Sequence, residues 1–225
     1  MSAYQRPAVD LPIFRDEAGR PIAYGDRWAG GPPEDAYSVV SHPERCAPLH
    51  SVALALIEHL RSEYEVEVDE SVDVLDDFIR RPGGTMKAVR VRPLDGDCAA
   101  LTFAFTDFPG IVVHAGAIHD LVFPTCGCDA CDTTWQTEAA ELERHVFAVV
   151  GGGYGESIGA GPRPWIEEAW DFADGHTSGR TQAPDLSRER LARARRELAS
   201  GAGLERVLRG DARTWAPWPR ASRAA

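Results

Sequence analysis

Lysine is almost absent from this chain: Lys87 is the single lysine among 225 residues, and arginine supplies the other basic side chains. Acidic residues outnumber basic ones and give a net charge of −11, which does not suit a protein whose main partner is nucleic acid. Long apolar runs are lacking as well, and none approaches the roughly 18 residues needed to cross a membrane. The first residues, MSAYQRPAVDLPIF, do not follow the basic-then-apolar order of a signal peptide. We therefore expect a cytoplasmic protein whose main partner is neither a membrane nor a nucleic acid.

Cysteine is scarce and odd in number, with five residues in all. An odd count argues against a closed framework of disulfides, and clustered cysteines in a reducing cytoplasm more often bind metal or do redox chemistry. Only one Cys-x-x-Cys pair occurs, and neither a Gly-x-Gly-x-x-Gly motif nor a phosphate-binding loop is present. The chain therefore offers one concentrated candidate site and no complete catalytic motif.

Composition divides the chain into three segments. Residues 1–36 are rich in prolines and paired glycines and predict an irregular arm, which aromatic side chains would fix in a groove: Phe14, Tyr24 and Trp28. Residues 37–180 predict the core domain. Residues 181–225 predict a basic helical extension, since 187–225 hold ten arginines against four acids. This extension would present a solvated helix face or fold back on the acidic remainder of the protein.

Alternating apolar residues predict strands in the middle of the chain. Residues 64–70, 86–92, 98–106 and 111–115 show this pattern, with an Asp-Gly hairpin signal after the second strand and a Phe-Pro-Gly turn after the third. The segment 98–106 is apolar on both faces, which indicates a central strand. The result is an antiparallel meander.

Apolar residues at helical spacing predict helices over 48–64, 133–150 and 185–199. Thr133 and Gln136 fit a capping box at the start of the second helix. Between the last two helices, the glycine-rich segment GGGYGESIGAGPRP predicts a loop around at most one short strand, and 165–173 fits helix and strand equally. The fold class we expect is α+β, with an antiparallel sheet of three to five strands and helices mainly on one face.

The candidate site is the run FPTCGCDACD, which places Cys126, Cys128 and Cys131 within six residues just before a predicted helix. Thiolates are soft ligands, and three of them in one turn can wrap a zinc ion. Gly127 would give the turn its conformational freedom, and the helix N-terminus would lower the pKa of the Cys131 thiol. Plain thiols in a tight loop, redox chemistry and an iron–sulfur cluster remain alternatives to structural zinc.

A fourth ligand is missing from this run. His119 stands closest and is the candidate we favour. The other candidates are spread over the chain: His114, His145, Asp129, Asp132, Cys46 and Cys98.

The segments FTDFPGIVVHAG and FPTCGCDACD, together with their surroundings over residues 37–150, resemble an actinobacterial family known as a domain of unknown function. The resemblance implies that Cys126, Cys128 and Cys131 are a hallmark of that family. It implies no activity.

Two functions from different classes fit these observations. The first is a non-catalytic cytoplasmic protein in which a structural zinc ion stabilises the cysteine loop and which acts by contact with a partner protein. The second is a thiol-dependent enzyme, redox or hydrolytic, that uses Cys128 or Cys131, because a nearby base or charge can activate a thiol.

Overall fold

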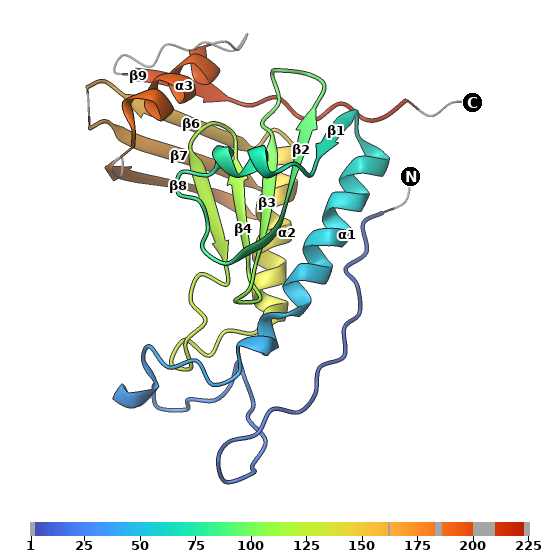
Figure 1. Ribbon diagram of the computed structural model, residues 1–225, viewed down its shortest axis with the longest axis vertical. Coiled ribbons are helices and arrows are strands. Elements are labelled where there is room, and N and C mark those ends of the chain that lie inside the picture. Colours follow the sequence, from blue (N-terminus) through green and yellow to red (C-terminus); the bar gives the residue numbers. More distant parts are fainter. Residues whose placement is uncertain (1–2, 162, 183–185, 200–209, 223–225) are drawn as a thin grey trace.

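The computed structural model of the protein describes residues 3–161, 163–182, 186–199 and 210–222. Within these residues the chain forms α-helices and two antiparallel sheets, one of five strands and one of four. This confirms the expected α+β class (Figure 1). None of the helices in the described ranges has the length and apolar character that a membrane crossing requires.

The first sheet is a meander whose strand order follows the sequence. Its strands are β1 (Val66–Asp69), β2 (Thr85–Pro93), β3 (Leu101–Thr106), β4 (Ile111–Ala115) and β5 (His119–Phe123). Strand β3 lies at the centre and all six of its residues are buried, as its apolar faces predicted. Strand β5 was not predicted, because its sequence, HDLVF, lacks a clear alternation of apolar and polar residues.

Two of the predicted helices cover this sheet and are confirmed. Helix α1 (Pro48–Glu63) packs on β1, β2 and β4, and helix α2 (Trp135–Val150) packs on β5. The N-cap of α2 lies one residue later than predicted. The side chain of Thr134, and not that of Thr133, accepts a hydrogen bond from the backbone N–H of Thr137. Both helices bury their predicted apolar stripes in the core.

A second sheet follows α2, where the sequence predicted a loop and an ambiguous segment. Its strands, in spatial order, are β8 (Gly175–Gln182), β7 (Trp165–Phe172), β6 (Tyr154–Gly159) and β9 (Gly210–Thr214). It shares one hydrophobic core with the first sheet, and α2 contacts both.

The glycines that suggested a loop instead make close packing possible. A Cβ atom on Gly153 would lie 2.3 Å from the carbonyl oxygen of Asp171, which leaves no room for a side chain. Between such glycines, Tyr154, Glu156 and Ile158 alternate inward as buried residues of β6. The inward-facing glutamate and the flanking glycines hid this strand from a reading of hydrophobic periodicity.

The C-terminal part packs back onto both sheets. Helix α3 (Arg188–Ala199) buries Leu191, Ala194 and Leu198, as predicted, and begins after Ser187, whose hydroxyl caps the N–H of Arg190. Trp218 is buried, and its indole N–H donates to the carbonyl of Ala99 at 2.9 Å. The segment expected as a helical extension thus also contains β9, while its residues 183–185, 200–209 and 223–225 lie outside the described residues.

Residues 3–47, which precede α1 and are called the N-terminal arm from here on, are largely irregular and contain two short 3₁₀ turns, η1 (Glu34–Ala36) and η2 (Pro43–Cys46). It begins against the helices, where the Tyr4 hydroxyl donates to Glu143 of α2 at 2.8 Å. It then runs beside α1 to the end of the molecule where the cysteine loop lies (Figure 1). Of the aromatic side chains expected to fix the arm, Trp28 contacts the cysteine loop, as the next section describes, whereas Phe14 and Tyr24 pack on each other and on His42 within the arm.

Candidate metal centre

The cysteine loop connects β5 to α2 and brings the three predicted thiols together. The sulfur atoms of Cys126, Cys128 and Cys131 all lie within 4.8 Å of one another, and those of Cys126 and Cys128 are 3.4 Å apart. All three are free cysteines; Cys128 is buried, whereas Cys126 and Cys131 are exposed. The group can hold a metal ion.

The geometry suits a tetrahedral thiolate site. Zinc–sulfur bonds of about 2.3 Å separate two sulfur ligands by roughly 3.8 Å. The sulfurs of Cys126 and Cys128 are 3.4 Å apart and all three lie within 4.8 Å of one another, so the group is compact enough to surround one ion.

The loop needs glycine at position 127 because a side chain would not fit there. The conformational freedom expected from the sequence is not the reason. Its φ angle is not positive, and a Cβ atom there would lie 2.4 Å from Cζ of the Phe108 ring. The ring of Phe108, from the turn between β3 and β4, therefore packs directly against the peptide between the first two cysteines.

The N-terminal arm holds the loop through backbone hydrogen bonds. The N–H groups of Asp129 and Ala130 donate to the carbonyls of Val39 (2.7 Å) and Ala36 (3.1 Å). The Trp28 indole N–H donates to the Asp129 carbonyl at 3.0 Å. Cys128, Ala130 and Ala36 form a small apolar cluster with Trp28 packed on it. The predicted role of Trp28 as an anchor of the arm is confirmed.

The buried carboxylate of Asp129 adds a polar connection between loop and arm. It accepts hydrogen bonds from the backbone N–H and the hydroxyl of Ser41, and the guanidinium groups of Arg27 (3.5 Å) and Arg45 (3.9 Å) lie beside it. Burial raises the pKa of Asp129, but the Ser41 hydrogen bonds and the two positive charges outweigh burial and leave the pKa below its ordinary value. Arg45 also donates to the carbonyl of Gly127 at 2.7 Å. Asp129 is therefore a structural residue of the loop.

The thiols do not titrate alike. A backbone hydrogen bond from Cys131 and the hydrogen bond from the Cys126 thiol lower the pKa of Cys128 to about 7. The hydrogen bonds that Cys131 shares with the other two sulfurs raise its pKa. The expectation that Cys131 would have the lowered pKa is therefore wrong, because the helix begins only after Thr134 and the donors converge on Cys128. Cys128 therefore ionises more readily than Cys131.

The histidine favoured as fourth ligand lies elsewhere. His119 starts β5 and packs against Trp170, with ring centroids 5.7 Å apart, and against Tyr154. Burial lowers the pKa of His119 to about 4. In the part of the chain that the structure describes, no histidine nitrogen joins the group of three thiols.

The remaining candidates, apart from Asp132, are also occupied away from the thiols. His145 packs on Trp170 and Phe172, and His114 pairs with Asp120 across two strands. Cys46 is a core residue, and the Cys98 thiol donates to the carbonyl of Pro217. Asp132, directly after Cys131, accepts from the backbone N–H of Arg27 through Oδ2. Its other oxygen, Oδ1, is buried and has no hydrogen-bond partner among the described residues.

Comparison with known proteins identifies a family but no activity. No curated protein and no solved structure matches the chain. One family model, described as a family of unknown function (DUF6226), matches residues 10–222. This range includes the cysteine loop, the N-terminal arm that holds it and both sheets, and it is wider than the 37–150 over which a resemblance was expected. The chain therefore belongs to the DUF6226 family.

Proposed function

We propose that Cys126, Cys128 and Cys131 bind one zinc ion and that the zinc-bound loop forms a rigid contact surface for a partner protein in the cytoplasm. The observation that carries this proposal is the convergence of three free thiols within 4.8 Å in a loop that the arm holds in place. A soft trithiolate set of this kind favours zinc over magnesium or calcium, which prefer oxygen ligands.

The ion has a structural role in this proposal. Loop residues 124–134 contain no helix or strand, and the hydrogen bonds of Asp129 and Ala130 attach them to the arm. Zinc bound by three thiolates on one side and these contacts on the other would fix the loop from both ends. Binding free energy at such a site adds directly to folding free energy.

A water molecule or Asp132 would supply the fourth ligand. Asp132 is the local candidate because its Oδ1 is buried without a hydrogen-bond partner among the described residues. A small movement of the loop after Cys131 would be required, since this oxygen is not part of the compact ligand group. An Asp132→Asn variant separates the two arrangements: it weakens zinc binding if the carboxylate is a ligand and leaves it unchanged if water is.

Cobalt(II) substitution tests the metal site. We expect purified protein to bind one Co²⁺ with the sulfur-to-cobalt charge-transfer and d–d absorption of a tetrahedral thiolate site, and zinc to displace it. Cys126→Ser, Cys128→Ser and Cys131→Ser should each lose most of this absorption. Cys98→Ser is the matched control, because Cys98 donates to Pro217 outside the loop. Absorption unchanged in all three loop variants would overturn the proposal.

Exposed apolar residues beside the loop motivate the contact role. Tyr37, Val39 and Val40 are all more than 40% exposed, and the carbonyl of Val39 accepts from Asp129 in the loop. Apolar residues grouped at one exposed place are typical of protein contacts.

A photo-crosslinking residue at position 40, in the full chain expressed in its source cells, tests this role. We expect a discrete crosslinked protein that is lost in a Cys126→Ser background. The same residue at position 54, where Leu54 is 47% exposed on α1, is the control. Identical products from both positions, or none from position 40, would contradict a contact at the loop.

The lowered pKa of Cys128 favours one second candidate, a thiol enzyme. Alkylation by iodoacetamide, carried out on the protein as purified and again after treatment with a chelator, decides between the two functions. Rapid modification of Cys128 in the protein as purified, without chelation, would support the enzyme. Modification only after a chelator removes metal supports the zinc loop.

A further inference from the structure

A second polar site lies far from the cysteine loop, on the face of the first sheet that α1 and α2 do not cover. It is a cavity of about 300 Å³ between β2, β3 and β4 on one side and α3 with the start of the C-terminal tail on the other. This volume is at the lower end of the range for small-molecule sites.

Arginines dominate the charge around this cavity. Five of them line it and come from three different elements: Arg90, Arg92, Arg190, Arg193 and Arg213. Three acids line it as well: Asp77, Asp95 and Glu197. Two further acids pair with lining arginines, Asp69 with Arg90 and Asp97 with Arg213. Of the five arginines, Arg92 and Arg190 form no ion pair among the described residues.

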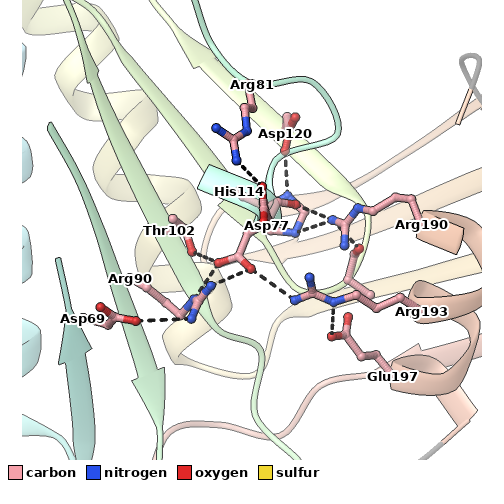
Figure 2. A network of polar contacts seen from close by, with 12 residues as sticks. Asp69, Asp77, Arg81, Arg90, Thr102, His114, Asp120, Arg190, Arg193 and Glu197 are labelled. Carbon is pink, nitrogen blue, oxygen red and sulfur yellow. Dashed lines mark hydrogen bonds and ion pairs between the residues drawn. The ribbon is translucent and has the colours of Figure 1, made fainter. Parts of the chain in front are cut away.

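Asp77 organises two of the arginines (Figure 2). The carboxylate of Asp77 accepts from Nε (2.6 Å) and Nη2 (2.8 Å) of Arg90 and lies 3.2 Å from Nη2 of Arg193. The hydroxyl of Thr102 donates to it at 2.7 Å. Arg90 also pairs with Asp69 at 3.5 Å and Arg193 with Glu197 at 3.3 Å, so carboxylates balance the charges of both arginines.

Arg190 is held without a carboxylate. Its Nη2 donates to the carbonyls of Asp77 and Ala117 and lies 3.3 Å from Nε2 of His114, and all three acceptors are neutral. Its Nε is buried without a hydrogen-bond partner, and it forms no ion pair within the described residues. Burial, together with the positive charge of Arg193, lowers the pKa of Arg190, and the carboxylates of Glu197, Asp77 and Asp120 offset this shift only in part.

His114 fixes the direction of Arg190. Nδ1 of His114 pairs with Asp120 at 2.6 Å, so Nδ1 carries the proton and Nε2 accepts from Arg190 (Figure 2). The Asp120 carboxylate in turn accepts from the backbone N–H of Ile79. The guanidinium group is therefore positioned in advance of any ligand, which lowers the entropic cost of binding.

We propose that this cavity binds a small molecule through its phosphate group. Arg92 of β2 and Arg190 of α3 line opposite sides of the cavity and suit a tetrahedral anion with several oxygens better than a planar carboxylate, which one bidentate guanidinium would satisfy. A phosphate monoester carries a charge of about −1.5 to −2 at pH 7 and so matches these two guanidinium groups, which form no ion pair among the described residues. The proposal is independent of the cysteine loop.

Isothermal titration of the full-length protein at constant ionic strength tests the proposal. The probes are glycerol 3-phosphate, inorganic phosphate and succinate. We expect saturable binding of one phosphate probe per chain and much weaker binding of succinate. Tighter binding of the ester identifies a phosphorylated metabolite as the ligand, whereas equal binding identifies free phosphate.

Three variants locate the binding. Arg190→Gln should weaken phosphate binding about tenfold or more, because a charge-assisted hydrogen bond is lost. Arg92→Gln should also weaken it with the fold intact, since Arg92 is exposed and has no ion-pair partner in the described residues. Arg188→Gln, an exposed residue of the same helix, is the control. The proposal is overturned if neither phosphate probe binds, if succinate binds equally well, or if Arg92→Gln and Arg190→Gln leave the affinity unchanged.

Discussion

Buried carboxylates connect segments that are distant in sequence. Asp129 joins the cysteine loop to the arm, and Asp77 joins the first sheet to α3. Glu156 accepts from the N–H groups of Ala117 and Ile118 and from the indole of Trp215. Each such carboxylate satisfies several donors, so its loss leaves buried polar groups unpaired.

Replacement of Asp129 by asparagine should destabilise the protein by about 3 kcal/mol, since Arg45 would remain buried without a neighbouring charge. Urea unfolding measures this change. Asp26→Asn, in an exposed position of the same arm, should stay within about 0.5 kcal/mol of the wild type. Equal stabilities of the two variants would show that Asp129 does not hold the arm.

His119 should make stability sensitive to acid. Its pKa is about 4 in the folded protein, against about 6.5 when unfolded, so the unfolded chain binds a proton that the folded chain does not between these values. The contribution of neutral His119 to the free energy of unfolding is fully present above pH 6.5. It is lost as the pH drops toward 4, by up to about 3 kcal/mol.

His119→Phe keeps an aromatic ring against Trp170 and removes the titration. The variant should therefore lose less stability than the wild type between pH 7 and pH 4, measured by urea unfolding at each pH. His176→Gln, at an exposed histidine, is the control and should follow the wild type. Parallel pH profiles for His119→Phe and the wild type would contradict the role assigned to burial.

At the scale of elements, a close contact with the turn between β3 and β4 restricts the conformation of the cysteine loop. Gly127→Ala places a methyl group against the ring of Phe108 and should cost about 1–3 kcal/mol. In a Phe108→Ala background the same change should cost much less. Thermal unfolding of the four proteins of this cycle gives the coupling, and additive costs would mean that the contact does not restrict the loop.

Elements with strong periodicity were predictable from sequence, and those shaped by tertiary contact were not. The stripes of α1, α2 and α3 and the alternation of β2 to β4 follow from local rules. Strand β6 is hidden by glycines whose purpose is close approach, and β9 pairs with it across more than fifty residues. Whether β6 and β9 form depends on the strands with which they pair, and local sequence patterns do not reveal a pairing between distant segments.

The same division applies to the candidate sites. The cysteine cluster was predictable because its three thiols are neighbours in sequence. The arginine cavity was not, because Arg90, Arg190 and Arg213 are brought together only by the packing of α3 and β9 on the first sheet. The arm contacts of the loop, through Ser41 and Arg45, also join residues more than eighty positions apart.

At the scale of the whole molecule, the C-terminal tail stabilises the fold by packing against its core. Trp218 packs on Tyr64 and donates to Ala99, and neighbouring tail residues bond to Glu65 and Glu63. Trp218→Ala should destabilise the whole protein by about 3–5 kcal/mol, measured by chemical unfolding. Trp165→Ala, at a residue 45% exposed, should cost far less. Equal costs would show that the tail is peripheral.

The most direct test of the metal centre is the zinc content of the full chain purified without added metal, measured together with a native thiol count. We predict about one zinc per chain and three thiols at positions 126, 128 and 131 that react only after chelation. Protein without metal, whose loop thiols react at once in the native state, would contradict a structural zinc site.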